Sequence, residues 1–197
     1  MAEAAFSVSF AGPLITFQDA GRPGNMRYGV AASGPMDRLA FEAAHAALGN
    51  APGLTAIEIS LGGLVLQCTK GAVTVAITGG DFVVQHGGQK TGSWTILTIR
   101  KGERLSISAG KAGSWAYLAF AGKPDTADWL GSHATHSTSG FGGGVLQTGQ
   151  AITLSEALVR DDRVGDILQP SFVARGPIRV VTGPQDQYFA EGSVARF

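Results

Sequence analysis

The chain has 197 residues, of which 44% are hydrophobic and 15% are charged, a composition typical of a globular protein with one large domain or two small ones. Its 15 Lys and Arg residues balance its 15 Asp and Glu residues, which argues against a nucleic-acid or anionic-membrane partner. The single cysteine, Cys68, excludes an intrachain disulfide, and the start MAEAAFSVSF lacks the features of a signal peptide. No apolar run approaches the roughly 18 residues of a membrane helix, so we expect a cytoplasmic protein.

The predicted fold is mainly β with one main helix. The 29 glycines separate short segments rich in Val, Ile and Thr, a pattern typical of strands joined by tight turns. The helix is predicted over Met36–Leu48, where apolar residues recur with a helical period before Gly49–Asn50. Strands, arranged after the helix as a series of hairpins, are predicted at Phe6–Phe10, Leu14–Phe17, Ala56–Leu61, Leu64–Cys68, Val73–Thr78, Phe82–Gln85, Trp94–Ile99, Arg104–Ser108, Trp115–Phe120, Ala151–Leu154 and Ile178–Thr182.

Thr16–Pro35 is the strongest candidate for a functional loop. It gathers charged groups and glycines in one run, whereas a core segment rarely contains unpaired charges and gains little buried area from glycine. Arg22 can bind a carboxylate in a two-pronged geometry. An equally acceptable alternative is that Asp19 and Arg22 pair with each other and brace a turn. The site hypothesis assigns a catalytic role to Asp19 and substrate binding to Gln18, Arg22, Ser33 and Gly34.

Two further segments offer backbone N–H groups that could face an oxyanion. One is the turn Thr78–Gly79–Gly80–Asp81, and the other is the glycine-rich loop Ser132–Gly143. Ordinary hairpin turns are the alternative explanation for both. From these segments the site hypothesis takes Asp81 as a second catalytic residue and Thr78, Gly79, Gly142 and Gly143 as substrate-binding residues.

Several familiar motifs are absent. Lys111 is followed by Ala112, so the hydroxyl that a P-loop supplies to magnesium is missing, and no Gly-x-Ser-x-Gly elbow is present. The run GFGGG at Gly140–Gly144 is not followed by a helical pattern that could direct its dipole at phosphate. His133 and His136 could ligate zinc together with Asp125 or Asp128, but no third ligand stands at a fixed spacing, so no metal site is predicted.

The sequence resembles a known family through collinear motifs over nearly its whole length. The longest is TFQDAGRPGNMRYGVAASGPMDRLAFEAAHAALGN, which begins at Thr16. Further matches are EISLGG at Glu58–Gly63, ITGGDF at Ile77–Phe82, AYLAFAG at Ala116–Gly122, LGSHATHSTSGFGGG at Leu130–Gly144 and VVTGPQDQYF at Val180–Phe189. This series is similar to that of the biotin-dependent carboxyltransferase family called allophanate hydrolase subunit 2. That family includes one of the subunits of 5-oxoprolinase and an antagonist of a sporulation kinase inhibitor.

The resemblance implies a cyclophilin-like β-barrel architecture and a partner resembling allophanate hydrolase subunit 1. It implies a subunit of a complex that acts on a small amide or lactam, with ATP-dependent hydrolysis of 5-oxoproline to glutamate as the leading hypothesis. One alternative is a non-enzymatic module that binds a partner, like the kinase-inhibitor antagonist. Another is carboxyl transfer from carboxybiotin to urea. No Met-Lys-Met is present, so no lysine resembles a biotin attachment site, and the absence of a P-loop implies that ATP is bound elsewhere. ATP and any biotin would therefore be supplied through the complex.

The chain also departs from the family pattern. Family members usually carry Arg after Leu130–Gly131–Ser132, where this chain has His133. They also usually continue past the position of Phe197, so we expect residues 1–197 to correspond to the N-terminal part of the carboxyltransferase domain.

Overall fold

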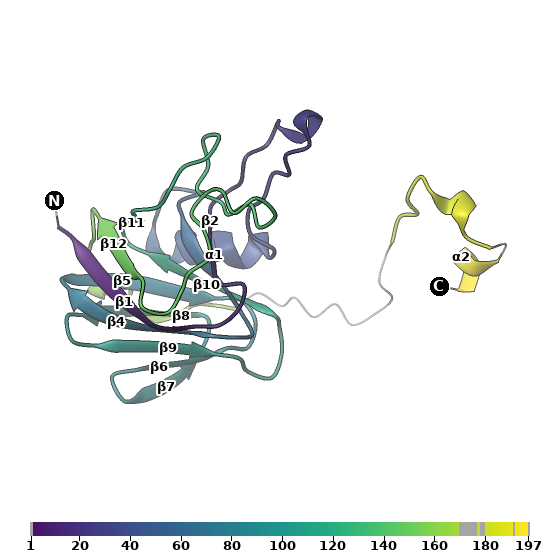
Figure 1. Cartoon of the computed structure of the whole chain (residues 1–197). Coiled ribbons are helices and arrows are strands. Elements are labelled where there is room, and N and C mark those ends of the chain that lie inside the picture. The colour runs from purple at the N-terminus through teal and green to yellow at the C-terminus, as the bar shows by residue number, and fades with distance from the viewer. Residues whose placement is uncertain (1, 170–176, 178–179, 191, 197) are drawn as a thin grey trace.

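Two antiparallel sheets and one long helix form the body of the computed structural model, which describes residues 2–169, 177, 180–190 and 192–196 (Figure 1). The first sheet has the strand order β11-β12-β1-β4-β9-β6-β7, and the second has the order β13-β8-β5-β10-β3-β2. The strands are β1 Ala4–Ala11, β2 Thr16–Gln18, β3 Ala56–Ser60, β4 Leu64–Lys70, β5 Ala72–Thr78, β6 Val83–His86, β7 Gln89–Gly92, β8 Thr95–Arg100, β9 Arg104–Ser108, β10 Trp115–Phe120, β11 Lys123–Pro124, β12 Ala151–Ser155 and β13 Gly165–Asp166.

The helices are few. The long one, α1, spans Arg38–Leu48, and a short helix α2 spans Ser193–Arg196. Three 3₁₀ turns, η1 to η3, lie at Met26–Tyr28, Asp161–Arg163 and Asp186–Tyr188. No helix among the described residues is both long and apolar enough to cross a bilayer.

The two sheets differ in how many of their faces are buried. In β1 and β4, buried residues alternate with more exposed ones, so the first sheet covers the core with one face only. In β3 and β10 almost every residue is buried. One face of the second sheet packs on the first sheet, where the rings of Phe6 and Phe120 lie 5.9 Å apart. The other face packs on α1, where the ring centroids of Phe41 and Tyr117 lie 5.9 Å apart.

The mainly β prediction with one main helix is confirmed, and the helix begins two residues later than Met36. Asp37 has extended backbone angles and its side chain accepts a hydrogen bond from the Ala40 N–H, which makes it the N-cap. The strand pairing of the described residues gives two sheets rather than one closed barrel. The predicted strand Ile178–Thr182 falls partly outside the described residues, since 178 and 179 are not among them, and Val180–Thr182 form no strand.

The predicted series of hairpins is wrong. Successive strands β3, β4, β5 and β6 belong alternately to the second and first sheets, so their connections cross between layers. Only β6 and β7 form a tight hairpin among the described strands, and β7 was not predicted because Gln89–Gly92 contains no large apolar residue. The glycine turns reverse the chain as expected. The successive strands from β3 to β6 do not pair with one another, however, because each of them pairs in the sheet where its apolar face is buried in the core.

Candidate functional site

Asp19 joins the two loops that the sequence singled out. Its Oδ1 accepts hydrogen bonds from the Gly21 N–H at 2.8 Å and the Ser132 hydroxyl at 2.6 Å, and its Oδ2 accepts one from the His133 N–H at 2.6 Å. Asp19 is buried, so these charge-assisted bonds are strong and shielded from water. The carboxylate therefore fixes the position of the Ser132–His133 backbone.

Arg22 makes a second set of bridges between the same loops. Its Nη1 donates to Ser33 Oγ at 2.9 Å, its Nε donates to the Trp129 carbonyl at 3.2 Å, and its Nη2 donates to the Ala134 carbonyl. The guanidinium also lies 4.9 Å from the centre of the Trp129 ring, within the range of a cation–π contact. Arg22 is only 2% exposed. Among the described residues it forms no ion pair with Asp19, so the alternative in which the two brace a turn together is wrong.

The glycines of the second loop lie against this framework. A Cβ on Gly142 would lie 2.2 Å from the Ala134 carbonyl oxygen, and one on Gly143 would lie 2.5 Å from the Cβ of Phe17. Thr135 donates from its N–H and its hydroxyl to the Phe17 carbonyl, at 2.9 and 2.8 Å. The loop after residue 131 is thus held close to the end of β2.

Gln18 and Gly34 also meet here. The Gly34 N–H donates to Gln18 Oε1 at 3.2 Å, and Gln18 Nε2 donates to Thr16 Oγ1 at 2.9 Å. Ser33, the partner of Arg22, has a φ of 57°, a left-handed conformation that is uncommon for serine. The structure therefore brings together seven of the residues in the site hypothesis: Gln18, Asp19, Arg22, Ser33, Gly34, Gly142 and Gly143.

The turn after β5 has different partners. The Thr78 hydroxyl donates to the Ala40 carbonyl at 2.7 Å and so attaches α1 to the second sheet. A Cβ on Gly79 would lie 2.7 Å from the Trp115 carbonyl oxygen. Asp81 accepts at Oδ2 from the Lys111 N–H at 3.3 Å. These contacts give Thr78, Gly79 and Asp81 structural partners away from the two loops.

A buried carboxylate that sequence reasoning missed lies under α1. Glu58 Oε2 accepts from the Tyr117 hydroxyl and from the Met36 N–H, both at 2.8 Å, and the Asp37 N–H donates to the Tyr117 hydroxyl at 2.7 Å. Burial raises the pKa of Glu58 and also that of Tyr117. A polar residue in an otherwise apolar strand was the available signal, since Glu58 sits between Ile57 and Ile59.

A small cavity lies beside His133. It has a volume of about 110 Å³, enough for several waters or one small polar molecule, and it is lined by Gly53, Leu54, Thr55, Lys123, Pro124 and His133. His133 Nδ1 lies 3.1 Å from Thr126 Oγ1 and 3.3 Å from the Ala127 carbonyl, which leaves Nε2 as the ring nitrogen available to a ligand. The ammonium of Lys123 lies 2.8 Å from Glu156 in an exposed ion pair.

No set of three or more His, Cys, Asp or Glu side chains in the described part of the chain is arranged to hold a metal ion. His136, which the sequence paired with His133 as a possible zinc ligand, lies 2.8 Å from Ser139 Oγ through its Nδ1. Its ring also packs against Trp129, with centroids 5.6 Å apart.

Known proteins are similar to this chain in sequence and fold. One of them, a subunit of 5-oxoprolinase from Escherichia coli, is 30% identical over 199 residues, covering 95% of this chain and 60% of that protein. Urea amidolyase of Saccharomyces cerevisiae is 34% identical over 156 residues, covering 76% of this chain and 8% of that protein. The crystal structure of Kluyveromyces lactis urea carboxylase matches with a TM-score of 0.72 at 28% identity, covering 84% of this chain and 15% of that one.

The chain thus spans 60% of the E. coli relative and a small fraction of the yeast protein. The family model for the carboxyltransferase domain, subdomains A and B, matches residues 28–197, which include the end of the first loop and all of the second. The matched segment contains His133, Lys123 and the cavity that they line. By this match the chain belongs to the carboxyltransferase domain family.

Proposed function

We propose that this chain is part of one subunit of a complex that opens a small lactam, with ATP-dependent hydrolysis of 5-oxoproline to glutamate as its reaction. The observation that carries the proposal is the cavity lined by His133 and Lys123, because a residue with a hydrogen-bonding ring and a residue with a cationic side chain border a space sized for a small polar molecule. Support for the substrate class comes from the E. coli relative, which is named as a 5-oxoprolinase subunit. We further propose that residues 1–197 correspond to the N-terminal part of a longer carboxyltransferase domain.

We assign separate roles in substrate binding to Lys123, His133 and Asp19. Lys123 would bind the carboxylate of the substrate, and its exposed pair with Glu156 is weak enough to be exchanged for it. His133 Nε2 would hydrogen bond to the lactam group and hold it in a fixed orientation. Asp19 would act as a positioning residue, because its bond to the His133 N–H sets where the ring stands. In the net reaction, one water would add to the lactam carbonyl, the ring C–N bond would break and the nitrogen would gain a proton. A second water would be consumed as ATP is hydrolysed to ADP and phosphate elsewhere in the complex.

ATP, and biotin if the complex uses it, would be supplied by other parts of the assembly. The partner would be a subunit resembling allophanate hydrolase subunit 1. The loop tip at η1 is a suitable contact for it, because Met26 and Tyr28 are 71% and 68% exposed while Arg22 clamps the base of the same loop. In Figure 1 this tip projects beyond the body of the protein. The same surface would serve the non-enzymatic alternative, in which the chain binds a partner without catalysis.

Carboxyl transfer to urea is the second candidate. The specific observation in its favour is the yeast urea amidolyase relative, which is 34% identical over the matched region. Urea would fit the same cavity but has no carboxylate for Lys123. The two reactions are therefore distinguished by the contribution of that lysine.

The test is an assay of the chain assembled with its partner subunits. We expect ATP-dependent release of glutamate from 5-oxoproline, and we expect His133→Gln and Lys123→Gln each to lower kcat/KM at least tenfold. Lys111→Gln, a change at another exposed lysine, is the matched control and should have no effect. Carboxylation of urea without glutamate release would favour the second candidate. Assembly with the partner but no turnover of either substrate would favour the binding module. Full activity of both His133→Gln and Lys123→Gln would refute the residue assignment.

A further inference from the structure

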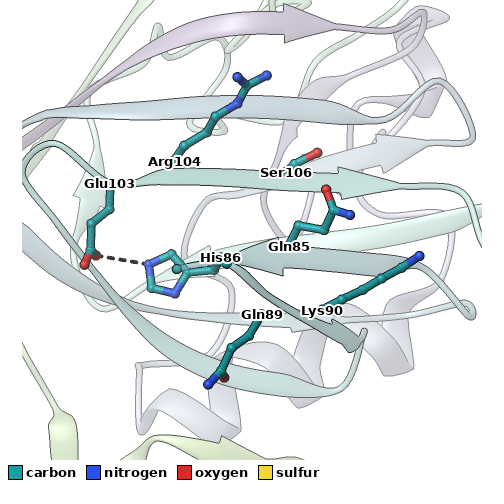
Figure 2. Close-up of a pocket in the computed structure, with 9 residues that line it drawn as sticks. Gln85, His86, Gln89, Lys90, Glu103, Arg104 and Ser106 are labelled. Carbon is teal, nitrogen blue, oxygen red and sulfur yellow. Dashed lines mark hydrogen bonds and ion pairs between the residues drawn. The ribbon is translucent and has the colours of Figure 1, made fainter.

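The outer face of the first sheet carries a polar groove at its β7 end. The groove has a volume of about 690 Å³ and lies over β6, β7 and β9. Figure 2 shows the side chains of Arg104, Ser106 and Gln85 on one side of the sheet, with His86 and Glu103 in contact at its end. The core face of the same strands is apolar, since Val84, Leu105 and Ile107 are buried there.

The strand register aligns the polar groups into a row. Lys90 pairs with Gln85 across β7 and β6, and Gln85 pairs with Ser106 across β6 and β9. Paired residues share a face, so the three side chains lie side by side on the outer surface. Arg104 lies two residues before Ser106 on β9 and therefore also points outward.

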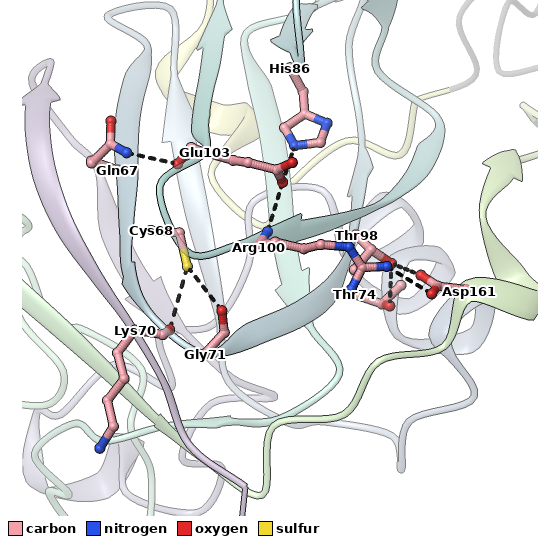
Figure 3. A network of polar contacts seen from close by, with 10 residues as sticks. All are labelled: Gln67, Cys68, Lys70, Gly71, Thr74, His86, Thr98, Arg100, Glu103 and Asp161. Atoms are coloured by element: carbon pink, nitrogen blue, oxygen red, sulfur yellow. Dashed lines mark hydrogen bonds and ion pairs between the residues drawn. The ribbon is translucent and has the colours of Figure 1, made fainter.

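The two cations of this groove are not neutralised. In the described part of the chain, Lys90 and Arg104 form no ion pair, whereas Lys70, Arg100 and Lys123 each have a carboxylate partner. The one acidic residue that lines the groove is Glu103, and its carboxylate already has partners at the end of the groove. Its Oε2 accepts from the Arg100 N–H at 2.7 Å and lies 3.0 Å from His86 Nε2 (Figure 3). The Arg100 hydrogen bond lowers the pKa of Glu103, which keeps the carboxylate ionised in these contacts.

Strand β7 is the last strand of its sheet, so no strand of the described part of the chain pairs with one of its sides. The β6–β7 turn has two residues, Gly87 and Gly88, with φ of 57° and 78°, as in a type I′ hairpin. The pair flanking such a turn is hydrogen bonded, and hydrogen-bonded pairs alternate along the ladder. The N–H and C=O groups of Lys90 and Gly92 therefore point away from β6, toward the open side.

We propose that β7 and this groove bind an extended acidic peptide segment of another protein chain, which adds as a strand beside β7. Its backbone would bond to Lys90 and Gly92, and the carboxylate nearest to Lys90 would pair with the ammonium of that residue. Lysine on an edge strand normally discourages pairing with other strands, and here it selects for acidic ones. An open groove of about 690 Å³ beside a strand edge suits an extended chain better than a small ion. The proposal uses none of the residues around His133 and is independent of the proposed function.

The probe is the synthetic peptide acetyl-Val-Asp-Val-Asp-Val-amide, and its Asn-containing counterpart is the matched control. Titration of the ¹⁵N-labelled chain with the Asp peptide should shift the amide resonances of Lys90 and Gly92. Lys90→Gln should weaken binding about two- to fivefold, the range expected for an exposed charge pair. Lys111→Gln should leave it unchanged.

The contribution of the backbone has its own test. Lys90→Pro removes an N–H that β6 does not use, so the hairpin should survive while binding falls further than in Lys90→Gln. Gly92→Pro repeats the test without loss of charge if Lys90→Pro fails to fold. Absence of binding, equal binding of the Asn peptide, or proline variants that bind like wild type would overturn the proposal. Displacement of the peptide by inorganic phosphate or glutarate at equal concentration would identify a small-anion site instead.

Discussion

The hydroxyl of Ser132 donates a 2.6 Å hydrogen bond to the carboxylate of Asp19, which lies 113 residues earlier in the chain. With the His133 N–H bond to the same carboxylate, this contact holds the two candidate loops in one arrangement. The cavity beside His133 depends on that arrangement.

Asp19→Asn should lower the free energy of unfolding by about 1–3 kcal/mol. An amide cannot accept at both of its ends, so at least one of the donors of Gly21, Ser132 and His133 loses its acceptor. Urea denaturation measures the change. Asp125→Asn is the control, because Asp125 is exposed and only its backbone N–H has a hydrogen bond. Equal stability of the two variants would contradict the bracing role of Asp19.

Gly142→Ala should destabilise the protein more than Gly144→Ala. Both glycines have positive φ, 89° and 84°, so both variants carry a strain of about 1 kcal/mol. Only the Cβ at residue 142 would meet the Ala134 carbonyl, whereas the space around Gly144 is open. We expect overpacking to cost Gly142→Ala about 2 kcal/mol more. Thermal unfolding of the two variants measures this difference, and the prediction is wrong if their melting temperatures are equal.

Glu58→Gln should leave stability at pH 7 unchanged or slightly higher. Burial raises the pKa of the Glu58 carboxyl above 4.5. The contribution of this carboxyl to the free energy of unfolding is therefore complete below pH 4.5 and is lost as the pH rises through the raised pKa. Gln cannot ionise and can still accept hydrogen bonds from Tyr117 and Met36. The variant should therefore be more stable than wild type only at pH values above the raised pKa of Glu58.

Tyr117→Phe is the contrasting change in the same network. It removes the acceptor of the Asp37 N–H and a donor to Glu58, at a cost of about 1–3 kcal/mol. Stability measured against pH for both variants tests the network. If the Glu58→Gln variant is much less stable than wild type at pH 7, the ionised carboxylate stabilises the folded state and the prediction is wrong.

His45 should make the protein sensitive to acid. Burial lowers its pKa from 6.5 to about 4, so the folded state resists protonation that the unfolded state accepts. Its contribution is complete above pH 6.5 and is lost as pH falls from 6.5 to about 4, by on the order of 3 kcal/mol. His45→Gln should remove this part of the pH dependence. Parallel stability profiles of the variant and wild type between these pH values would refute the prediction.

Much of the fold could be predicted from local pattern. Arg104–Ser108 and Trp115–Phe120 have the predicted bounds, because apolar runs between glycines define a strand without knowledge of its partner. The helix start was misplaced for a nonlocal reason. Met36 is apolar and fits the helical period, but its N–H bonds to Glu58 on β3 and its side chain is 70% exposed.

The candidate site was predictable only in part. Asp19 and Arg22 stood out by their residue types, but their partners Ser132, Ala134 and Trp129 lie more than 100 residues away and have no local signature. Asp81 carries the same kind of signal as Asp19, a carboxylate in a glycine turn. Topology alone separates them, because the turn at Asp81 packs on the backbone of residues 110–112.

The bridges made by Asp19 also affect when the loops can form during synthesis. The first loop emerges from the ribosome before the second, and the groups that satisfy its carboxylate arrive only with Ser132 and His133. Contacts of such sequence separation form slowly, since a long stretch of chain must be closed first. Nascent chains that end before this point therefore hold Asp19 and Arg22 without their partners, and ordering of the loop is a late event in folding.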